Sequence, residues 1–577
     1  MSPFQRLRTG GSYLTSRARK FLASETRGMH EAAYLLAAFA FASQVIGLLR
    51  DRILAASFGA GHTLDLYYAA FLVPNFLFST VASLLSLYAL MPILSRVEEE
   101  KKGLMISFLR DLALIFILGM TFVSLVAYVL APALAPLVAP GLAADPVSRM
   151  QLILLMRILL LQPILLGISN TISSLTQLRH RFVLYSVSPL LYNLGIIFGA
   201  VFLYPYLGIA GLGIGVVFGA LMHMAVQLPF FFAEKSEGRV GTPRLIALTR
   251  EILALSIPRT LALASNQISL LVLIALASFL VPGSITIFNF AYNLQSVPLT
   301  IIGISYSVAA FPTFARLYAQ GAKDEFSRFA EDALRHIVFW TVPCTVFMIV
   351  LRAQIVRTIL GAGQFNWDAT RLTAAALALF VLSLLAQSAT FLISRAYYAS
   401  GDTRKPFWFG CADIGISILS AVGLLWVFDT NFFFKEFIEA LLRVNDIAGT
   451  GVLMLSLGYA LGSIAEFIIG YFFFARDFAV SRASFRRLFF ETFAASVIGG
   501  AVSYIILAAT GQTGTINTTV GIFAQGLGAG IAGIVVAVAL LWLLKSRELR
   551  EVLAALRRRF ADTPQVVPVQ PSDVETT

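Results

Sequence analysis

Long apolar stretches separated by short polar ones set the pattern of this chain. A membrane-spanning helix needs about 20 mostly apolar residues, and a helix satisfies its backbone hydrogen bonds internally, as a bilayer requires. Stretches of this length recur along the whole sequence and predict an all-α polytopic membrane protein with about 14 transmembrane helices. The predicted spans cover residues 31–49, 64–91, 104–135, 151–177, 183–204, 208–233, 251–281, 285–313, 330–351, 370–399, 406–428, 450–474, 489–510 and 518–544.

The most informative polar interruption lies between the first two predicted spans, within residues 43–92. A short hinge there contains Arg50, Asp51, Arg52 and Asp65. Charges set between membrane-length apolar runs are costly unless they face water or a partner, so the hinge predicts the lining of a wet vestibule. Two simpler interpretations stay open: Asp65 caps the N-terminus of its own helix, and Arg50 snorkels to the membrane surface.

Composition agrees with a membrane protein. Hydrophobic residues make up 58% of the chain, charged residues 13%, and the mean hydropathy is +0.82. The two cysteines, Cys344 and Cys411, lie in apolar runs without metal-ligand spacing and are expected to pack as small apolar residues. The net charge of +12 does not indicate nucleic acid, because the basic residues gather in the loops between spans.

The distribution of lysine and arginine predicts the orientation of the spans. With the N-terminus inside, 32 of the 43 basic residues fall on the inside, eight fall outside and three lie within spans. Basic residues concentrate on the cytoplasmic side of membrane proteins, so both termini are expected in the cytoplasm. Residues 1–30 are then a basic cytoplasmic leader rather than a secretory signal.

Two weak internal repeats suggest a duplicated architecture. The motif MPILSR (91–96) recurs as FPTFAR (311–316), and QLRHRF (177–182) is matched by GDTRKPF (401–407), each pair six spans apart. A same-direction duplication predicts two pseudo-symmetric six-helix lobes followed by two extra helices. The predicted units are the leader 1–30, an N-lobe at 31–240, a C-lobe at 241–480, two C-terminal helices at 481–545, and a cytoplasmic basic helix with a disordered tail at 546–577.

Two segments outside the spans have amphipathic patterns. Residues 429–449 form an outside loop long enough for a short helix at the membrane interface. Residues 545–560 predict a basic amphipathic helix, which either rests on anionic inner-leaflet lipid or is a solvated extension.

The sequence contains none of the familiar catalytic motifs, and its histidines lack metal-binding spacing, so neither an enzyme nor a metal site is expected. Polar residues within spans are the candidate binding groups. Asn289 and Asn293 share one face of the eighth span, as helix-packing groups or as cavity lining. Arg259 follows Pro258, where a broken helix would expose it to a cavity. Asp413 is a membrane acid that leaves ion coupling open.

At this point the sequence resembles a known family. The run GLLRDRILAASFGAGHTLDLYYAAFLVPN (47–75) is similar to the signature of the MurJ/MviN lipid II flippases of the MOP exporter superfamily. Three later stretches are similar as well: LAPLVAPGL (134–142), GAGQF (361–365) and RAYYASGDTRKP (395–406). The resemblance covers about residues 31–545 and includes the order and spacing of the spans.

The resemblance implies a fold and an activity. The family has two six-helix lobes in a V, with two C-terminal helices lining a groove for the lipid tail. It implies a flippase that moves undecaprenyl-diphosphate-linked peptidoglycan precursor across the bacterial inner membrane, without a cofactor but driven by membrane potential or a coupling ion. The expected partners are the polyprenyl-diphosphate lipid and membrane lipid, and a monomer is expected.

The resemblance also places the binding residues, and here the chain departs from the family. Arg50 and Asp65 match the family pattern, and Asn75 ends the Pro-Asn motif of the second span. Gln44 stands where the family usually has arginine, and Tyr292-Asn293 stand where it has an Asp-Arg pair. The expected substrate-binding residues are Arg50, Arg52, Asp65, Arg259, Asn289, Asn293, Gln44 and Asn75.

The missing charges keep other functions open. One is a flippase for another polyprenyl-linked glycan. Another is a non-transporting membrane scaffold that recruits partners through its basic tail, and a third is a soluble-drug antiporter of the same superfamily. Deleting the tail after Lys545 distinguishes the scaffold from the transporters. A transporter should keep its function without the tail, whereas a scaffold that recruits partners through the tail should lose it.

Overall fold

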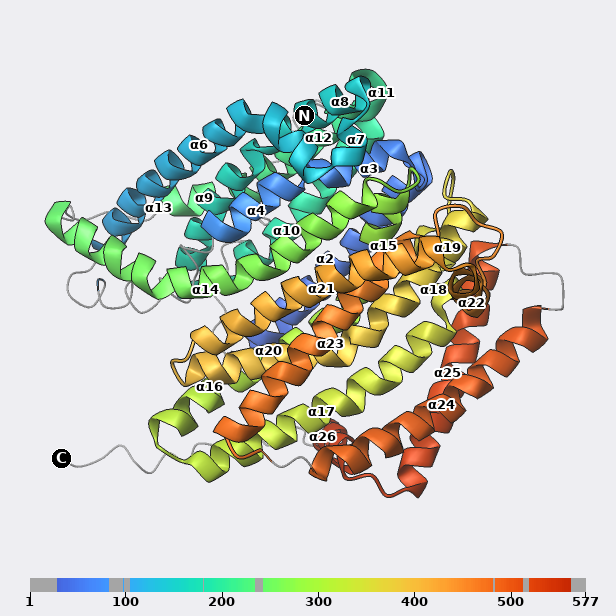
Figure 1. Ribbon diagram of the computed structural model, residues 1–577. Helices are drawn as coiled ribbons and strands as arrows, with labels where there is room; N and C mark the ends of the chain where they lie inside the picture. Colours follow the sequence, from blue (N-terminus) through green and yellow to red (C-terminus); the bar gives the residue numbers. More distant parts are fainter. Residues whose placement is uncertain are drawn as a thin grey trace, which may run out of the picture.

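The computed structural model describes residues 29–81, 97, 104–179, 181–233, 242–480, 483–511 and 518–561, and every regular element in this part of the chain is helical (Figure 1). Residues 1–28 of the predicted leader, the repeat motif at 91–96 and the tail after residue 561 lie outside the described residues. The division into lobes and tail at the boundaries given above therefore stays a prediction.

The first half of the chain supplies the elements drawn blue to green in Figure 1. They are α2 (Met29–Phe58), α3 (His62–Ala70), α4 (Leu72–Val81), α6 (Leu104–Val138), α7 (Pro140–Ala143), α8 (Pro146–Leu159), α9 (Leu161–Leu178), α10 (Phe182–Phe198), the π-helical turn η2 (Gly199–Leu203), α11 (Tyr204–Leu207), α12 (Ile209–Ala225) and α13 (Leu228–Ala233).

The second half continues from green to red. Its elements are α14 (Thr242–Ala277), α15 (Ser284–Pro298), the π-helical turn η3 (Leu299–Ile304), α16 (Ser305–Ala319), α17 (Lys323–Val350), α18 (Arg352–Leu360), α19 (Trp367–Phe380), the 3₁₀ turn η4 (Val381–Ser383), α20 (Leu384–Ala399), α21 (Arg404–Thr430), α22 (Phe432–Leu442), α23 (Val452–Asp477), α24 (Ala483–Gly511), α25 (Thr519–Leu543) and α26 (Arg547–Ala561).

The prediction of a polytopic helical protein is confirmed. Within the described residues, 11 helices are long and apolar enough to cross a membrane, and each coincides with a predicted span. The other three predicted spans fall on α2, on α3 with α4, and on α14. The end of the second of these spans and some side chains of the other two are not described. The total of 14 spans accordingly stays a prediction.

One predicted helix end and one predicted helix break are wrong. The first span was expected to end at residue 49, but α2 continues through Arg50 and Arg52 to Phe58, and the chain turns only at Gly59, whose φ is +64°. The charges do not end the helix because they find protein partners, described below. The helix break expected at Pro258 is also absent, since α14 is helical from Thr242 to Ala277.

The helices form two groups that Figure 1 shows one above the other. Helices α4, α6, α9, α10 and α12 lie in the upper group, and α16, α17, α20, α21 and α23 lie in the lower one. Helix α14 runs beside α4 and α6 of the upper group and beside α21 of the lower one. The two groups therefore share a long interface, in which α14 and α15 bring the second half of the chain against the first.

Small residues let the helices pack closely within a group. A Cβ atom on Gly195 of α10 would lie 2.2 Å from the Cα of Gly219 on α12, and one on Gly215 would lie 2.4 Å from the Cα of Gly199. Membrane helices depend on such close backbone contact because lipid supplies no hydrophobic drive for their association. The glycine-rich sequence of α12 therefore fixes its contact with α10.

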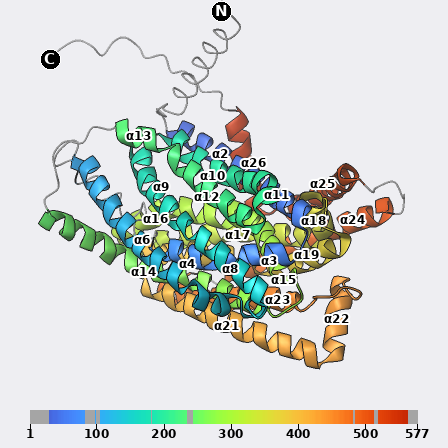
Figure 2. The same cartoon turned by 90° about the horizontal axis from the view of Figure 1, so that it is seen from above.

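The helix predicted within residues 429–449 is present as α22. The Asn431 side chain accepts a hydrogen bond from the Phe434 backbone N–H at 3.0 Å and so caps the helix start. Figure 2 shows α22 turning away from the end of α21 at the edge of the molecule. Its position at a membrane interface stays a prediction.

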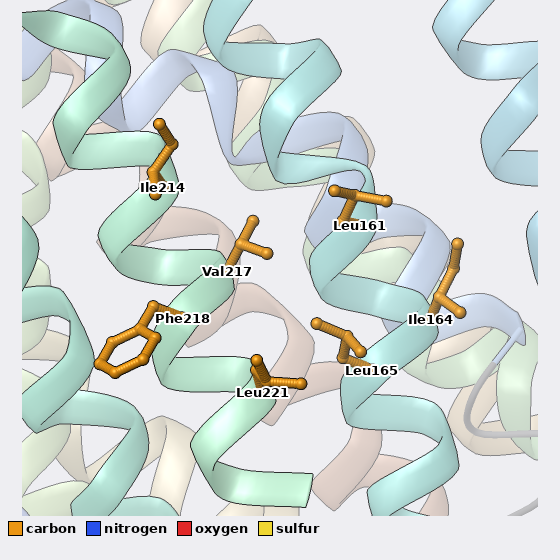
Figure 3. A pocket seen from close by; sticks show the side chains of 7 residues that line it. All are labelled: Leu161, Ile164, Leu165, Ile214, Val217, Phe218 and Leu221. Atoms are coloured by element: carbon orange, nitrogen blue, oxygen red, sulfur yellow. The ribbon is translucent and has the colours of Figure 1, made fainter. Parts of the chain in front are cut away.

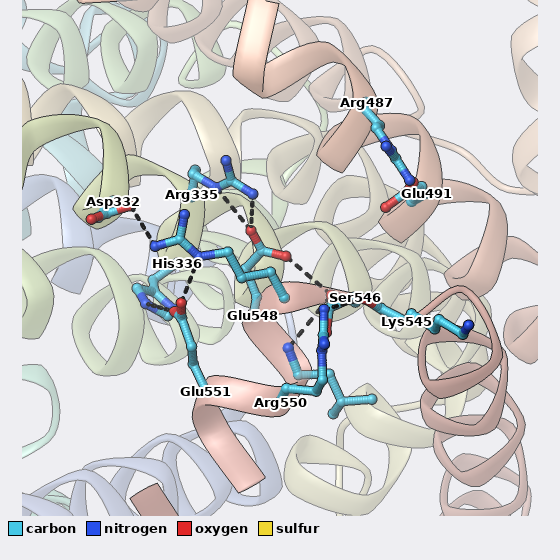
Figure 4. Close-up of polar contacts among 12 residues, drawn as sticks. Asp332, Arg335, His336, Arg487, Glu491, Lys545, Ser546, Glu548, Arg550 and Glu551 are labelled. Carbon is cyan, nitrogen blue, oxygen red and sulfur yellow. Dashed lines mark hydrogen bonds and ion pairs between the residues drawn. The ribbon is translucent and has the colours of Figure 1, made fainter. Parts of the chain in front are cut away.

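The basic C-terminal helix is docked on the protein at its start. In Figure 4, Arg335 of α17 donates from Nε and Nη2 to Glu548 Oε1 of α26, at 2.8 and 2.5 Å. The Ser546 hydroxyl donates to the other carboxylate oxygen at 3.0 Å, and Leu549 is buried in a cluster with Phe339. Neither sequence interpretation of this helix, lipid-bound or solvated, predicted that its first turns would pack on α17.

We expect Glu548→Gln to release α26. The substitution keeps the shape of the side chain but removes the charge that pairs with Arg335, and losing a charged hydrogen bond costs about 1–3 kcal/mol. Amide hydrogen exchange in residues 547–554 should accelerate. Glu491→Gln is the matched control, because it removes an ion pair within α24, with Arg487 at 2.6 Å. Unchanged exchange in the Glu548→Gln variant would show that the Arg335–Glu548 pair does not hold α26.

The same pair predicts a pH dependence. Burial opposes ionisation of Glu548, but its hydrogen bonds, including that from Arg335, outweigh this and lower its pKa below the ordinary 4.5. A carboxylate with a lowered pKa stabilises the docked state above its unfolded pKa, and this stabilisation is lost as the pH falls through the folded pKa. Docking should hold at neutral pH and weaken only below 4.5.

Candidate functional site

A buried ion pair lies at the interface of the two helix groups. Arg50 of α2 donates from Nε and Nη2 to Asp51 Oδ1, at 2.9 and 2.7 Å, and Asp51 is only 3% exposed. Two neighbours in a helix normally point in different directions, so this contact bends both side chains toward one site. Asp51 is thereby the counter-ion of Arg50.

Two asparagines complete this site from opposite groups. Arg50 Nη1 donates to Asn193 Oδ1 of α10 at 2.9 Å, and Asn293 Nδ2 of α15 donates to Asp51 Oδ2 at 3.2 Å. Helices α2 and α10 belong to the first half of the chain and α15 to the second. We call Arg50, Asp51, Asn193 and Asn293 the central cluster, since it links the two halves by hydrogen bonds.

Tyrosines border the central cluster. Tyr67 and Tyr68 lie close enough to Arg50 and Asp51 to interact with them electrostatically, and so does Tyr192 with Arg50. The Tyr68 hydroxyl is buried and finds no hydrogen-bond partner among the described residues. A buried hydroxyl without a partner is costly, and it marks a place where a bound molecule or water would be stabilised.

Arg52 holds a different contact between the groups. Its Nη1 donates to the backbone carbonyls of Thr358 at 2.5 Å and Ile359 at 3.2 Å, in the last turn of α18. The last carbonyls of a helix lack partners within the helix and carry partial negative charge, which an arginine satisfies. Arg52 is therefore engaged in joining α2 to α18.

Asp65 binds the start of α15. Its Oδ2 accepts from the Gly283 backbone N–H at 2.5 Å, and its Oδ1 accepts from the Thr286 N–H at 2.8 Å and the Thr286 hydroxyl at 2.7 Å. The interpretation of Asp65 as the cap of its own helix is wrong. It caps a helix from the other half of the chain, where a carboxylate meets the positive end of the helix dipole.

Backbone segments also touch directly beside these side chains. The Gln364 N–H donates to the Ala56 carbonyl at 2.9 Å. A Cβ atom on Gly363, whose φ is +53°, would lie 2.2 Å from that carbonyl, and one on Gly283, whose φ is +99°, would lie 2.4 Å from the Ala60 carbonyl. Glycine is required at both positions by its conformation and by the close approach.

We call the contacts of residues 52–65 with residues 283–286 and 358–364 the outer contact. The distribution of lysine and arginine predicts that this end of the molecule faces the outside. The polar part of the outer contact consists of backbone groups, an arginine and an aspartate. Leu54, Leu64, Ile285 and Leu360 are buried beside it in one apolar cluster.

The remaining predicted residues have varied positions. Asn289 donates to the Ile285 carbonyl of its own helix at 2.8 Å, a bond within α15 that favours neither helix packing nor cavity lining. Gln44 on α2 and Asn75 on α4 are half-buried. Arg259 belongs to α14, but its side chain lies outside the described residues. The structure thus brings Arg50 and Asn293 together, and Arg52 and Asp65 into the outer contact.

Two members of the central cluster were missing from the predicted set. Asp51 was part of the predicted hinge, but its adjacency to Arg50 suggested only a shared polar segment. Asn193 lies 143 positions from Arg50, and nothing in its local sequence indicates the contact. An asparagine within an apolar span was the available signal for Asn193.

A shallow groove lies elsewhere, on α9 and α12. It has a volume of about 390 Å³, and its lining side chains in Figure 3, among them Leu161, Phe218 and Leu221, are all aliphatic or aromatic. None of the predicted residues whose side chains are described lines it. Without a polar group it offers nothing to bind a charged head group.

Comparison with known proteins places the chain among lipid transporters. The family model described as "Lipid II flippase MurJ" matches residues 54–524. A probable lipid II flippase MurJ of Thermotoga maritima is 26% identical over 516 residues, which are 89% of this chain and 96% of that protein. The lipid II flippase MurJ of Burkholderia cenocepacia is 24% identical over 393 residues, 66% of this chain and 75% of that protein.

Solved structures show the same fold. A lipid II flippase MurJ in an inward closed conformation aligns with a TM-score of 0.68 at 19% identity, covering 92% of this chain and all of the other. An inward-facing multidrug resistance MATE family transporter of the MOP superfamily aligns with a TM-score of 0.59 at 13% identity, covering 76% of this chain and 94% of the other.

We expect Gly363→Ala to weaken the outer contact. The added Cβ meets the Ala56 carbonyl, so the hydrogen bond from Gln364 to Ala56 cannot form without movement. Amide exchange at Gln364 and at Gly283 to Thr286 should become about tenfold faster, which corresponds to about 1.4 kcal/mol.

Gly321→Ala is the matched control for this variant. Gly321 also has a positive φ, +68°, but a Cβ there would meet nothing within 4 Å. It therefore carries the same backbone strain without the collision. If both variants leave exchange at residues 283–286 unchanged, the outer contact does not depend on the close approach of Gly363.

Proposed function

The chain belongs to the lipid II flippase MurJ family, and we propose that it moves lipid II from the inner to the outer leaflet of the bacterial inner membrane by alternating access. Lipid II is an undecaprenyl-diphosphate-linked peptidoglycan precursor, so the protein must carry a large polar head group past the bilayer interior while the prenyl chain stays in lipid. In this proposal the protein acts as a monomer, with both termini in the cytoplasm.

The central cluster is the single observation that supports this proposal most strongly. A diphosphate is best bound by a guanidinium in a water-poor site, where charged hydrogen bonds are strong and two-pronged geometry is available. Arg50 lies between the two helix groups, where it donates to Asn193, Asn293 is a second donor, and the Tyr68 hydroxyl has no described partner. A head group placed there would contact both halves of the chain.

Asp51 has a defined role in this mechanism. Without substrate it neutralises Arg50, which would otherwise be a bare charge in the membrane interior. A phosphate oxygen can replace the Asp51 carboxylate on the Arg50 guanidinium. The displaced Asp51 carboxylate stays nearby and repels the phosphate, because both are negatively charged. The cluster therefore binds a phosphate group while remaining weak enough to release it after transport.

In this proposal the outer contact opens and closes the outer end of the interface during transport. It closes one end of the interface by Arg52, Asp65 and the backbone near Gly363, together with buried apolar side chains such as Leu54 and Leu360. We propose that substrate enters from the opposite, cytoplasmic end and that release requires the outer contact to open. Membrane potential or a coupling ion provides the drive; one elementary charge moved through 100 mV is worth about 2.3 kcal/mol.

A second candidate is a flippase for another polyprenyl-linked glycan. Gln44 and the pair Tyr292-Asn293 stand where the resembling family carries charge, so the described cluster offers one guanidinium and one carboxylate to the anionic group. A diphosphate brings about two negative charges, which a single paired arginine neutralises incompletely. A head group with fewer charges fits this cluster better.

Lipid binding separates the two candidates. Native mass spectrometry of the full chain with lipid II and with bare undecaprenyl phosphate should show tighter binding of lipid II, and the chain should support growth of cells depleted of their own lipid II flippase. Equal binding of the two lipids together with failed complementation would reject lipid II and favour another glycan.

We expect the double variant Arg50→Gln/Asp51→Asn to fold and to bind lipid II about 10- to 100-fold more weakly, since it loses charged hydrogen bonds worth about 1.5–3 kcal/mol. Removing both charges avoids an unpaired buried Asp51, which Arg50→Gln alone would create. Arg149→Gln is the control, because Arg149 is exposed and donates to the Pro132 carbonyl. Unchanged binding in the folded double variant would move the site away from the central cluster.

A further inference from the structure

Two arginines lie near one tyrosine at the end of the molecule predicted to face outside. Arg443, which ends α22, donates from Nη2 to the Tyr504 hydroxyl of α24 at 2.8 Å, and its guanidinium lies 5.8 Å from the centre of the Tyr504 ring. Arg352, the first residue of α18, lies close enough to interact electrostatically with both Arg443 and Tyr504. Its Nη1 donates to the Ile349 carbonyl at 2.9 Å.

Neither arginine has a carboxylate partner among the described residues. Asp446, the acid of the same loop, pairs instead with Arg371 at 3.5 Å. The undescribed residues 512–517, which follow α24, have the sequence QTGTIN and contain no acid. The two guanidinium groups therefore form a local excess of positive charge.

The charges of this pair oppose each other. Burial lowers the pKa of Arg352, and the positive charge of Arg443 lowers it further. Such an arrangement costs free energy unless an anion is present.

The loop that carries Arg443 is held by contacts other than its guanidinium. Arg371 donates from Nε and Nη2 to the Arg443 backbone carbonyl, at 3.1 and 2.6 Å. The Thr450 hydroxyl donates to the buried Glu439 carboxylate of α22 at 2.6 Å. The Arg443 side chain is thus positioned by its backbone, and its remaining N–H donors are available for a ligand.

Large apolar side chains are exposed on α22 and α24, the helices that lead to Arg443 and carry Tyr504. Tyr504 lies two turns from the end of α24 at Gly511, and its neighbour Ile505 is 65% exposed. Phe433 and Phe437 of α22 are 84% and 61% exposed, on a helix that connects two membrane spans. Tyrosine and exposed aromatic residues are typical of the depth at which lipid head groups meet acyl chains.

We propose that Arg352, Arg443 and Tyr504 form a binding site for the phosphate group of an anionic lipid in the outer leaflet. Two guanidinium forks and a hydroxyl match the oxygens of a phosphate, and the exposed aromatic residues of α22 contact its acyl or prenyl chain. Arginine is rare on the outside of membrane proteins, and a lipid phosphate supplies the anion that compensates this pair. The proposal holds whichever glycolipid the protein transports.

Lipid binding to the full chain tests this site. The double variant Arg352→Gln/Arg443→Gln, purified in detergent, is titrated with phosphatidylglycerol by native mass spectrometry. We expect binding at least about tenfold weaker than in the unchanged protein, and about threefold weaker in Tyr504→Phe, which loses one neutral hydrogen bond. Zwitterionic phosphatidylcholine should bind weakly to all of them.

The matched control is Lys435→Gln/Arg149→Gln. It removes two basic residues from the same predicted side, and Lys435 lies over the Phe428 ring while Arg149 binds a backbone carbonyl. Its phosphatidylglycerol binding should be unchanged. Equal binding by the Arg352→Gln/Arg443→Gln variant and the unchanged protein would overturn the proposal.

Two further outcomes are decisive. If inorganic phosphate displaces phosphatidylglycerol at equal concentration, the acyl chains add nothing to binding and the assignment to lipid is wrong. If the double variant fails to fold, the single variants Arg443→Gln and Tyr504→Phe decide: weaker phosphatidylglycerol binding in both supports the site, and unchanged binding in both rejects it.

Discussion

A positive charge in the interior of a membrane protein needs a partner, and this constraint organises the structure around Arg50. Its guanidinium lies where the two helix groups meet, and Asp51, Asn193 and Asn293 supply the oxygens and the amide that satisfy the pair. These partners come from α2, α10 and α15. Asp51 and Asn193 offset the cost of burying the charge from within the first half of the chain, and Asn293 adds a hydrogen bond from the second half. A ligand that replaces Asp51 on Arg50 would therefore also alter the hydrogen bond that joins Asp51 to Asn293.

The outer contact depends on the same constraint in a milder form. Arg52 and Asp65 each bind the end of a helix from the other half of the chain, so charge meets helix dipole on both sides of the contact. Glycines at 283 and 363 let the backbones approach closely enough for these bonds. Opening this contact would also expose apolar side chains, because Leu54, Leu64, Ile285 and Leu360 are buried in one cluster there.

The sequence predicts the helices better than their partners. Apolar length located the spans, and the pattern of residues 429–449 indicated α22, because both signals are local. Asp65 shows where prediction from local sequence fails. Its partner Gly283 lies 218 positions away, so the neighbouring residues could only assign Asp65 to its own helix. Arg50 to Arg52 were expected to end a span, since charge usually does. They continue α2 because distant asparagine and carbonyl groups satisfy them.

A structure of the chain with lipid II bound, determined in a lipid nanodisc, tests the central claim most directly. The account predicts that the diphosphate contacts the Arg50 guanidinium, and that Asp51 has moved away from Nε and Nη2 of Arg50. A diphosphate bound elsewhere, with the Arg50–Asp51 pair intact at its present 2.7 Å, would contradict it.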